Sequence, residues 1–526
     1  MERTWAISGV DLHLDLEGPR VRAALEAGLR DAVSSGRLGP GTRLPSSRGL
    51  AADLGIARNT VAEAYGQLVA EGWLTARQGS GTRVAARVDG SGADQGRTGN
   101  GGRTADRGAT ADGRPGADHR SGAGYRPTPD HRPGADRAGD FAGAPPATRN
   151  RYDLRPGSPD VSAFPRSAWL RCARTALVQA PFAALDYSDP RGRPELRAAL
   201  ADYLARTRGV RASPDRIVVC SGFTHGFALL CQALRQHGAR MLAIEEYGLP
   251  TVPAAASAAG LDLSCLAIDA EGAVVAELGD ADAVVLTPAH QFPLGMPLAP
   301  RRRASVVQWA TSGERLIIED DYDGEFRYDR HPVGALQAHA PDRVVYAGTA
   351  SKTLAPGLRL AWLVVPPGLV EPLAAARMLA ERHTGVIDQL TLAELIRSGA
   401  YDRHIRRSRL AYRRRRDRLV AQLRRRAPQA HVSGIAAGLH ALVDLPPGLS
   451  EEEVIARGRD HGLAVIGLAS FDHRGTRHRE ALVVGYAKPP EHAFTGAVAR
   501  LAATLAADTG RLSRGPDRLG RRPPGG

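Results

Sequence analysis

Apolar residues recur every three to four positions in residues 11–85, which is the spacing of amphipathic helices. The pattern predicts one helix between Pro19 and Gly36 and two more over residues 46–54 and 58–70. Two short strands then flank a Gly-Ser-Gly turn. Three helices followed by a hairpin predict an N-terminal winged helix-turn-helix domain, with a small helical protein-interaction domain as the alternative.

Short apolar runs alternate with helical patterns in residues 151–510. This alternation predicts an α/β domain built on a mostly parallel central sheet. Ligands of such sheets collect at the carboxyl ends of the strands, so the residues that follow each run are candidates for a binding site. The predicted strands cover residues 217–220, 241–244, 283–286, 316–319 and 343–346.

Aliphatic residues larger than alanine almost vanish between the two patterns. Residues 86–150 are rich in Gly, Ala, Arg, Asp and Pro, and the sequence RPGAD occurs in them twice. Such a segment cannot bury enough apolar surface to offset its chain entropy, so we predict a disordered linker. Residues 511–526 are predicted to be a similar disordered tail. The linker would allow the N-terminal domain to reorient.

Composition narrows the choice of partner and compartment. The 526 residues carry a net charge of +14, which favours an anionic partner. The four cysteines have neither paired nor metal-ligand spacing, so we expect reduced thiols and no metal site. No signal peptide and no apolar stretch long enough to span a membrane is recognisable. We therefore expect a cytoplasmic protein without membrane contact.

Lysine is almost absent from this basic chain. Of 70 Lys plus Arg residues, only Lys352 and Lys488 are lysine. A lysine amine can lose its proton and attack a carbonyl carbon to form a Schiff base, whereas arginine stays protonated. Lys352 is therefore a candidate for the covalent attachment of pyridoxal 5'-phosphate. The alternative is the chance survival of a surface lysine, of which Lys488 would be an example.

Other residues suited to this cofactor follow the predicted strands. Gly222 and Phe223 open a helix, whose backbone amides can bind phosphate. Asp320 can hold a protonated pyridine nitrogen, and Tyr322 would point the same way if the strand continued. An acidic solvated loop is the alternative there. Near Lys352, Ser351 and Arg359 are further candidates for phosphate binding.

The N-terminal pattern also resembles a known family. Arg58 and Asn59 begin the third helix, and their side chains suit purine edges in the major groove of DNA. The sequences LPSSRGLA (44–51), RNTVAEAY (58–65) and EGWL (71–74) resemble the GntR family of bacterial transcription regulators. One departure is Ala57, where a helix-capping serine is usual. The resemblance implies DNA contacts from Arg48, Arg58, Asn59, Thr60, Gln78 and Gly79.

The larger segment resembles a subgroup of that family, the MocR group, in which a GntR-type head precedes an aminotransferase-like domain. The motifs are DPRG (189–192), TPAHQFP (287–293), IEDDYDGEFRY (318–328) and GTASKTLAPGLR (348–359). The resemblance implies a fold-type I pyridoxal-phosphate domain over residues 151–510, a smaller C-terminal α+β subdomain and a homodimer. In that fold Lys352 would form the internal aldimine, Asp320 would hold the pyridine nitrogen and Tyr322 the 3'-oxygen. The phosphate would be held by Ser351, Arg359 and the backbone of Gly222 and Phe223.

Two departures from that group affect the expected chemistry. EEYGL (245–249) replaces a motif with a later tyrosine, so the aromatic residue over the cofactor ring is absent or supplied by Tyr247. Val483 occupies the position at which aminotransferases carry the arginine for the substrate α-carboxylate. Without that bidentate clamp, full transamination is not expected. Arg477, Arg479 or Lys488 are possible replacements.

Three hypotheses therefore compete. The first is a regulator that binds a double-stranded DNA operator and senses pyridoxal phosphate, an amine or an amino acid through the Lys352 aldimine. The second is an active aminotransferase with an accessory DNA-binding domain. The third is a DNA-binding protein whose large domain has lost the cofactor and only dimerises. The set of Lys352, Asp320, Tyr322 and Arg359 favours the first over the third.

Overall fold

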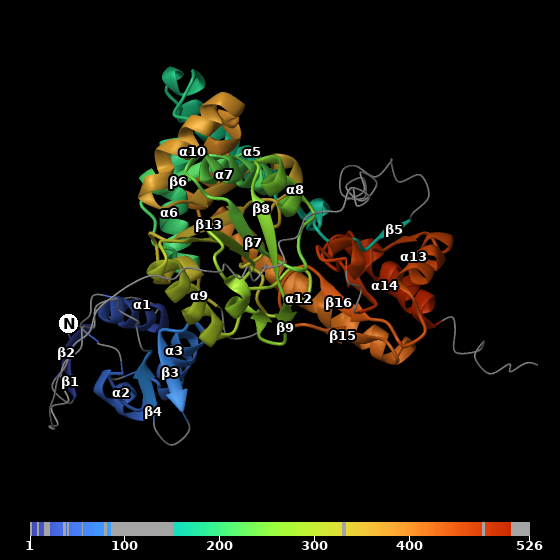
Figure 1. The fold of residues 1–526 in the computed structure, drawn as a ribbon, viewed down its shortest axis with the longest axis horizontal. Helices are drawn as coiled ribbons and strands as arrows, with labels where there is room; N and C mark the ends of the chain where they lie inside the picture. The colour runs from blue at the N-terminus through green and yellow to red at the C-terminus, as the bar shows by residue number, and fades with distance from the viewer. Residues whose placement is uncertain are drawn as a thin grey trace, which may run out of the picture.

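The computed structural model describes residues 3–7, 10–14, 21–34, 38, 41–54, 56–77, 81–85, 151–328, 333–475 and 479–506. The predicted linker and tail, together with Gln78 and Gly79, lie outside the described residues. A small N-terminal head, a central α/β domain and a C-terminal subdomain follow one another along the chain (Figure 1). Within the described residues, no helix combines the length and the apolar character needed to cross a membrane.

The head contains the predicted three helices and hairpin. Its helices are α1 (Val21–Ser34), α2 (Ser47–Leu54) and α3 (Arg58–Ala70), and its hairpin consists of β3 (Leu74–Arg77) and β4 (Gly81–Val84). Leu25, Leu50, Val61 and Leu68 form one apolar core with Trp73. The winged helix-turn-helix prediction is confirmed. The chain begins with an unpredicted antiparallel pair, β1 (Arg3–Ile7) and β2 (Val10–Leu14).

A seven-stranded sheet forms the centre of the large domain. All of its pairings are parallel except those of β14, which runs antiparallel to both of its neighbours. The mostly parallel sheet is therefore confirmed, and β8 and β14 are the two strands that the apolar runs did not predict. In spatial order the strands are β6 (Ile217–Cys220), β14 (Ala361–Val364), β13 (Val344–Thr349), β12 (Leu316–Asp320), β11 (Ala283–Leu286), β7 (Met241–Glu245) and β8 (Asp262–Leu266).

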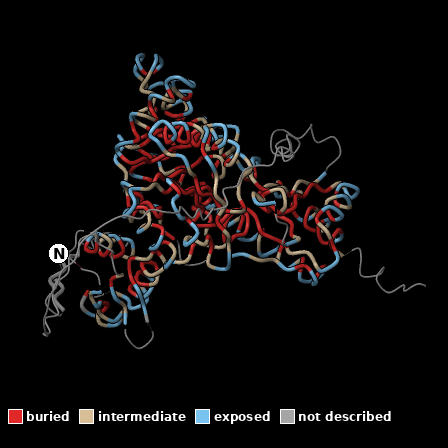
Figure 2. Tube along the Cα trace, viewed as in Figure 1, coloured by how far each residue is buried: buried red, intermediate tan, exposed pale blue. Residues whose placement is uncertain are grey.

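Helices cover both faces of this sheet, so most of its strand residues are buried, except in the edge strand β8 (Figure 2). Alternating strand residues point to opposite faces. Val218 and Val345 share a core with α7, α8 and α10, whereas Val219 contacts α6 and α11, and Val344 contacts α9. The helices are α5 (Arg166–Gln179), α6 (Pro194–Arg208), α7 (Phe223–Gln236), α8 (Thr251–Ala258), α9 (Pro300–Ser312), α10 (Pro367–Ala380) and α11 (Val386–Arg397).

The C-terminal subdomain has the predicted α+β composition. Its antiparallel sheet has the order β15, β16, β18, and the short strand β17 pairs with β5 from the start of the large domain. The strands are β5 (Tyr152–Asp153), β15 (His431–Ser433), β16 (Ala441–Asp444), β17 (Leu463–Ala464) and β18 (Ala481–Val484). The helices are α12 (Ala400–Arg426), α13 (Glu451–Asp460) and α14 (Glu491–Ala506), and two short strands, β9 (Ile268–Asp269) and β10 (Gly272–Ala273), pair elsewhere.

The head packs directly against the large domain beside α9 (Figure 1). Trp73 stacks on His339, with 4.4 Å between the ring centroids and 28° between the ring planes. The neighbouring Glu71 carboxylate accepts two hydrogen bonds from Arg30, at 2.7 and 2.8 Å. It also lies against Gly334, where an added Cβ would be 3.0 Å from the Glu71 carboxyl carbon. The residue after α3 and the start of the hairpin therefore form the contact between the two domains.

Candidate cofactor site and DNA-binding head

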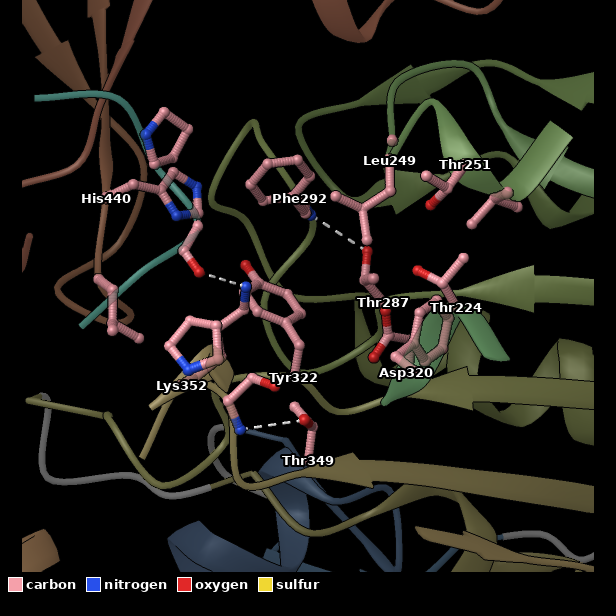
Figure 3. Close-up of a pocket in the computed structure, with 18 of the residues that line it drawn as sticks. Thr224, Leu249, Thr251, Thr287, Phe292, Asp320, Tyr322, Thr349, Lys352 and His440 are labelled. Atoms are coloured by element: carbon pink, nitrogen blue, oxygen red, sulfur yellow. Dashed lines mark hydrogen bonds between the residues drawn. The ribbon is translucent and has the colours of Figure 1, made fainter. Parts of the chain in front are cut away.

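A cavity of about 530 Å³ lies at the carboxyl ends of the central strands and extends to the C-terminal subdomain. This volume falls within the range of about 300–1,000 Å³ that is usual for small-molecule sites. Asp320 and Tyr322 from the end of β12 and Lys352 from the turn after β13 converge on it (Figure 3). Of the seven residues predicted to bind the cofactor, six line the cavity, namely Phe223, Asp320, Tyr322, Ser351, Lys352 and Arg359.

Lys352 lies in the turn that follows β13, with its amine in the cavity. Its Nζ donates a hydrogen bond to the carbonyl oxygen of Gly157 at 2.6 Å. Burial lowers the pKa of the Lys352 amine, although the charges of Asp320 and Asp323 act in the opposite direction. A lowered pKa increases the fraction of neutral amine, which is the form that attacks a carbonyl.

Asp320 is the last residue of β12, and its carboxyl group is buried at the cavity wall. Burial raises the pKa of Asp320 to about 8, while the nearby Lys352 amine opposes this rise. A cation placed beside this carboxyl group would favour its ionised form. Tyr322 also faces the cavity, but the strand does not continue to it, because β12 ends at Asp320 and Tyr322 lies in a turn. The two side chains therefore meet through the turn and not through strand alternation.

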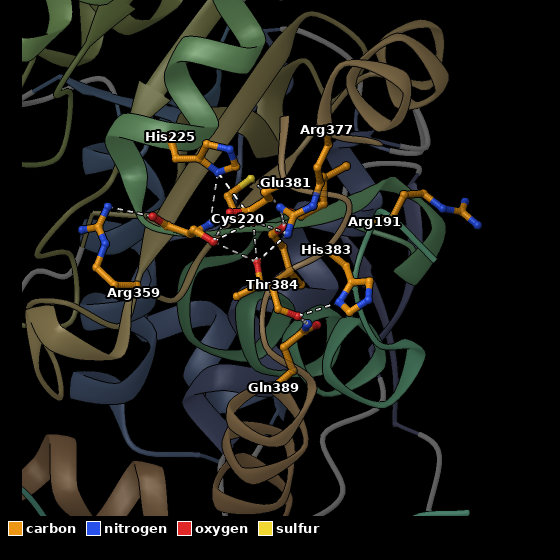
Figure 4. Close-up of polar contacts among 12 residues, drawn as sticks. Arg191, Cys220, His225, Arg359, Arg377, Glu381, His383, Thr384 and Gln389 are labelled. Carbon is orange, nitrogen blue, oxygen red and sulfur yellow. Dashed lines mark hydrogen bonds and ion pairs between the residues drawn. The ribbon is translucent and has the colours of Figure 1, made fainter. Parts of the chain in front are cut away.

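The lining of the cavity also combines a helix start with an arginine. Gly222 precedes α7 with a φ of 94°, and a Cβ on it would lie only 2.5–2.7 Å from guanidinium atoms of Arg359. Arg359 Nη2 donates to the Ser221 carbonyl oxygen at 2.7 Å (Figure 4). The free backbone amides at the start of α7 and this guanidinium together favour a phosphate group.

A partly exposed network holds Ser221, whose carbonyl oxygen accepts the hydrogen bond from Arg359. The Ser221 hydroxyl donates to the Glu381 carboxylate, with oxygens at 2.6 and 2.8 Å. Arg377 donates to the same carboxylate at 2.9 Å and also contacts Thr384 (Figure 4). Burial raises the pKa of Glu381, but the hydrogen bond from Ser221 and the charge of Arg377 outweigh it, so the pKa lies below its ordinary value. The sequence offered no signal for this network, because its members come from distant segments.

Further residues at the cavity were missed by the sequence analysis as functional candidates. Glu245 accepts hydrogen bonds from the Thr287 hydroxyl and amide at 2.6 and 3.1 Å, and burial raises the pKa of Glu245 to about 7. His440 lines the same wall, and burial lowers its pKa to about 3. Beside them, His290 Nδ1 lies 2.9 Å from Asp323 Oδ2. Glu245, Thr287, His290 and Asp323 lie in the motifs quoted above, whereas His440 lies in none.

The two departures from the MocR motifs take definite positions. Tyr247 lines the cavity, and burial raises the pKa of its hydroxyl to about 12. Val483 lies in β18, fully buried in an apolar cluster with Tyr247, Phe292 and Tyr322. Of the candidate replacements for an arginine at this position, Lys488 lines the cavity, Arg479 binds Asp444 elsewhere, and Arg477 lies outside the described residues.

Of the six predicted DNA-contacting residues, the four that the structure describes are exposed or half-buried on the head. Arg58 and Asn59 are exposed in the first turn of α3, and Thr60 beside them is half-buried. Arg48 is exposed on α2. Ala57 occupies the N-cap position of α3 without a side-chain hydrogen bond, as its sequence departure implies. A recognition helix with these residues at its start can present them to base edges.

The residues at the cavity fit pyridoxal phosphate chemically. A buried amine, a buried carboxyl group and a helix start paired with an arginine correspond to the aldehyde, the pyridine nitrogen and the phosphate of that cofactor. Gly222 leaves the space that a side chain would otherwise fill beside Arg359.

Comparison with known families gives two matches in the same order along the chain. Residues 22–84 match the bacterial regulatory proteins of the gntR family, and residues 164–478 match aminotransferase class I and II. A GntR-type head joined to an aminotransferase fold defines a class of DNA-binding transcription regulators. The chain belongs to this class as a MocR-type member of the GntR regulators.

Individual relatives agree with this assignment. The uncharacterized HTH-type transcriptional regulator YhdI of Bacillus subtilis is 32% identical over 83% of this chain and 85% of its own length. The HTH-type pyridoxine biosynthesis transcriptional regulator PdxR of Corynebacterium glutamicum is 30% identical over 90% of this chain and 93% of its own. A Pyrococcus horikoshii kynurenine aminotransferase structure shares the fold, with a TM-score of 0.62 and 23% identity over 69% of this chain and 92% of that chain.

Proposed function

We propose that this regulator binds pyridoxal 5'-phosphate at Lys352 and changes its operator binding in response to a ligand there. The ligand is the cofactor itself, or an amine or amino acid that replaces Lys352 on it. The observation that carries the proposal is that Lys352, Asp320 and Arg359 line one cavity, with Gly222 against Arg359. The proposed units are a DNA-binding head over residues 11–85 and an effector domain over 151–510.

Each of the residues at the cavity has a separate proposed role in cofactor binding. Bound pyridoxal phosphate supplies an aldehyde that a lysine amine can link to, and a ring that withdraws electrons. Lys352 provides the amine, and its burial favours the reactive neutral form. Asp320 would hold the pyridine nitrogen in its protonated form, and Tyr322 the 3'-oxygen. Arg359, Ser351 and the first amides of α7 would bind the phosphate.

Coupling to DNA requires two conformations that the ligand distinguishes. The contact between Trp73 and His339 provides a physical connection, because it joins the hairpin of the head to the end of the 3-10 helix Leu336–His339. The sheet supports the same short helix, because the buried Glu319 carboxylate accepts hydrogen bonds from the backbone amides of Leu336 and Gln337 at 2.7 and 2.9 Å. Glu319 directly precedes Asp320 in β12. A change at Asp320, which would hold the cofactor nitrogen, can therefore reach the head through Glu319 and the 3-10 helix.

A working aminotransferase is the second candidate function. The Lys352 amine, whose pKa is lowered by burial, and the Asp320 carboxyl group would serve that reaction equally well. Burial of Val483 in an apolar cluster argues against it, because β18 then contributes no arginine to hold a substrate carboxylate. Loss of the cofactor, the third possibility, is disfavoured by the retained lining of Lys352, Asp320, Tyr322 and Arg359.

We further propose a homodimer formed through the large domain. Apolar side chains are exposed on α5, on the turn that follows it and at the adjoining ends of α10 and α11. Phe182 and Leu379 are exposed over 95% and 91% of their surface. A second copy covering this surface would remove a large apolar area from water. The other members of the patch are Leu170, Leu177, Val178, Leu185, Tyr187, Met378 and Ile387. Because bacterial DNA lies in the cytoplasm, we place the regulator there.

The deciding experiment maps the operator of the full-length protein with and without pyridoxal phosphate. We expect a visible absorbance change on cofactor addition. We also expect the affinity for the operator, or the extent of the footprint, to depend on the cofactor. Lys352→Ala should lose both effects while its head still binds DNA. A wild-type spectrum that matches Lys352→Ala would refute cofactor binding. Sustained turnover of an amino acid with a keto-acid acceptor would favour the aminotransferase instead.

A further inference from the structure

A buried histidine and a buried acid lie behind Tyr322, and none of the roles proposed above uses them. His290 comes from the loop that follows β11, and Asp323 from the turn that follows β12. His290 Nδ1 lies 2.9 Å from Asp323 Oδ2 and 3.0 Å from the Tyr322 hydroxyl oxygen. The His290 and Asp323 side chains are exposed over only 3% and 2% of their surface.

The chemistry of the three groups decides where the histidine proton lies. The oxygens of an ionised carboxylate only accept hydrogen bonds, so His290 Nδ1 must carry a proton to make its contact with Asp323. The same N–H has the Tyr322 oxygen as its second acceptor. The Tyr322 oxygen therefore accepts at His290, and its own proton is left for another acceptor.

The Tyr322 proton has two possible acceptors. Burial, followed by the charges of Asp323 and Asp320, raises the pKa of Tyr322 well above its ordinary value, and a hydrogen bond to Asp323 acts in the same direction. Tyr322 therefore keeps its proton, and Asp323 is one acceptor for it. An oxygen of a ligand in the cavity is the other, because Tyr322 lines the cavity whereas His290 and Asp323 do not (Figure 3).

A loop of the C-terminal subdomain holds the pair in place. Gly438 precedes β16, and a Cβ on it would collide with the His290 ring and would lie 2.5 Å from Asp323 Oδ2. The Gly438 carbonyl oxygen accepts hydrogen bonds from the buried Tyr328 and Tyr486 hydroxyls at 2.5 and 2.6 Å. The loop is therefore fixed at the point where it contacts His290 and Asp323.

Other titratable groups face the same cluster. Burial lowers the pKa of His440 to about 3, so its ring is neutral, and the centroids of the His440 and His290 rings lie 5.3 Å apart. Asp320, Lys352 and Tyr486 also lie near Tyr322 or Asp323. Each variant used below keeps these groups, so their charges cancel when variants are compared.

We propose that His290 and Asp323 are positioning residues that direct the Tyr322 hydroxyl proton toward the 3'-oxygen of pyridoxal phosphate. His290 holds the phenol oxygen through Nδ1–H and also occupies Asp323, which weakens the competition of Asp323 for the Tyr322 proton. The Tyr322 O–H thus remains available to the cavity. The pair would influence the charge of the cofactor without touching it. This inference rests on the proposed binding of pyridoxal phosphate at Lys352.

The pH dependence of visible absorbance tests the proposal in full-length protein loaded with pyridoxal phosphate. The 3'-oxygen shares a proton with the nitrogen that links the cofactor to Lys352. A hydrogen bond from Tyr322 stabilises negative charge on that oxygen, so the proton leaves at a lower pH. We expect Tyr322→Phe and His290→Ala each to raise the midpoint of the titration by about one pH unit, a tenfold change in the ratio of the two forms.

Double variants separate the direction of the Tyr322 hydrogen bond from general effects of charge. In the Tyr322→Phe background, His290→Ala should cause no further shift, because the hydroxyl through which His290 acts is gone. In the Asp323→Asn background the shift should also be largely lost, because an amide competes for the Tyr322 proton less than a carboxylate does. His290→Asn should stay near the wild type, since its amide nitrogen can replace Nδ1–H.

His404→Gln is the matched control for the loss of a buried histidine. His404 Nε2 lies 2.8 Å from the Thr353 carbonyl oxygen, and His404 does not line the cavity. Its absorbance midpoint should equal that of the wild type. Thermal unfolding and cofactor loading are recorded for every variant. If His290→Ala does not fold, His290→Gln takes its place, because the longer side chain carries its amide past the Nδ1 position.

The outcomes separate this proposal from the one on which it rests. An unchanged midpoint in His290→Ala, or a shift that persists in the Tyr322→Phe background, would overturn the positioning role while cofactor binding stands. If pyridoxal phosphate causes no visible absorbance change in the wild type, the proposed function fails and this inference fails with it.

Discussion

Trp73 of the head stacks on His339 of the large domain, and this pair joins the two functional halves of the chain. Trp73 is buried and His339 is half-buried, and within the part of the chain that the structure describes the His339 Nε2 atom has no hydrogen-bond partner. An aromatic pair of this kind contributes about 0.5–1.5 kcal/mol beyond the area it buries. The contact is therefore weak enough to be broken by a ligand-induced change and strong enough to bias the position of the head.

His339→Ala should release the head from the large domain. The stacking energy predicts a shift of the docking equilibrium by about 0.5–1.5 kcal/mol, roughly a factor of 2 to 12. Small-angle scattering should show a larger radius of gyration, and limited proteolysis should cut faster between the domains. His492→Ala is the control, because His492 is exposed on α14. Unchanged scattering in His339→Ala would show that other contacts hold the head.

The same histidine predicts a dependence on pH. Burial, followed by the charge of Arg303, lowers the pKa of His339 from 6.5 to about 3. Above pH 6.5 the ring is neutral whether the chain is folded or unfolded. Between pH 6.5 and about pH 3, only the unfolded chain gains a proton on His339, so the free energy of unfolding decreases as the pH falls. At about pH 5 the loss is on the order of 2 kcal/mol.

His339→Phe isolates this effect, because phenylalanine keeps an aromatic ring against Trp73 but does not titrate. The midpoint of thermal unfolding should fall less between neutral pH and about pH 5 in His339→Phe than in the wild type. Carboxyl groups elsewhere titrate equally in both proteins, so the difference reports on residue 339. Parallel curves for the two proteins would contradict the assignment.

Ala57→Ser should stabilise the head. Ala57 is the N-cap of α3 and makes no side-chain hydrogen bond, so a serine oxygen there can accept a backbone amide of the first turn. Capping of this kind contributes about 1 kcal/mol. The urea midpoint of the head should rise. Ala52→Ser, at an exposed position inside α2, should give no gain and serves as the matched control.

Gly222→Ala should weaken binding of pyridoxal phosphate, because it disturbs the proposed site for the phosphate group. The new methyl group would lie 2.5–2.7 Å from the Arg359 guanidinium, and the φ of 94° is unfavourable for alanine. We expect the dissociation constant of pyridoxal phosphate to rise by about tenfold or more. Gly357→Ala is the control, because nothing lies within 4 Å of its added Cβ. Equal affinity of the two variants would place the phosphate elsewhere.

Arg58→Ala should weaken specific operator binding by about 1–3 kcal/mol, because an arginine at the start of the recognition helix reads guanine edges. Arg58 is exposed in the first turn of α3. Competition assays with operator and with unrelated duplex DNA measure the change, and binding to unrelated DNA should fall far less. A footprint and affinity unchanged from the wild type would mean that another helix reads the bases.

Local patterns were enough to predict the three helices and the hairpin of the head and five strands of the central sheet. The stripe of Val61, Tyr65 and Leu68 predicted α3, and the four-residue apolar runs predicted five strands of the central sheet, because both signals are short-range. Local patterns failed where a partner decides the conformation. The chain turns after Asp320 instead of extending β12 to Tyr322. In the same way, nothing in the arginine-rich sequence of α12 indicates that Arg415 is buried.

For the site, the sequence by itself determined the chemistry, because a rare lysine, an acid and a glycine-led helix start each carry their reactivity wherever they lie. Only the tertiary structure decided which side chains meet. Arg415 is neutralised by Asp160 at 2.7 Å, and Lys488 reaches Asp153 at 2.8 Å, across large separations in the chain. No local periodicity encodes such pairs, since they depend on how distant elements pack. Lys488, which composition alone presents as a chance survivor, therefore lines the same cavity as Lys352.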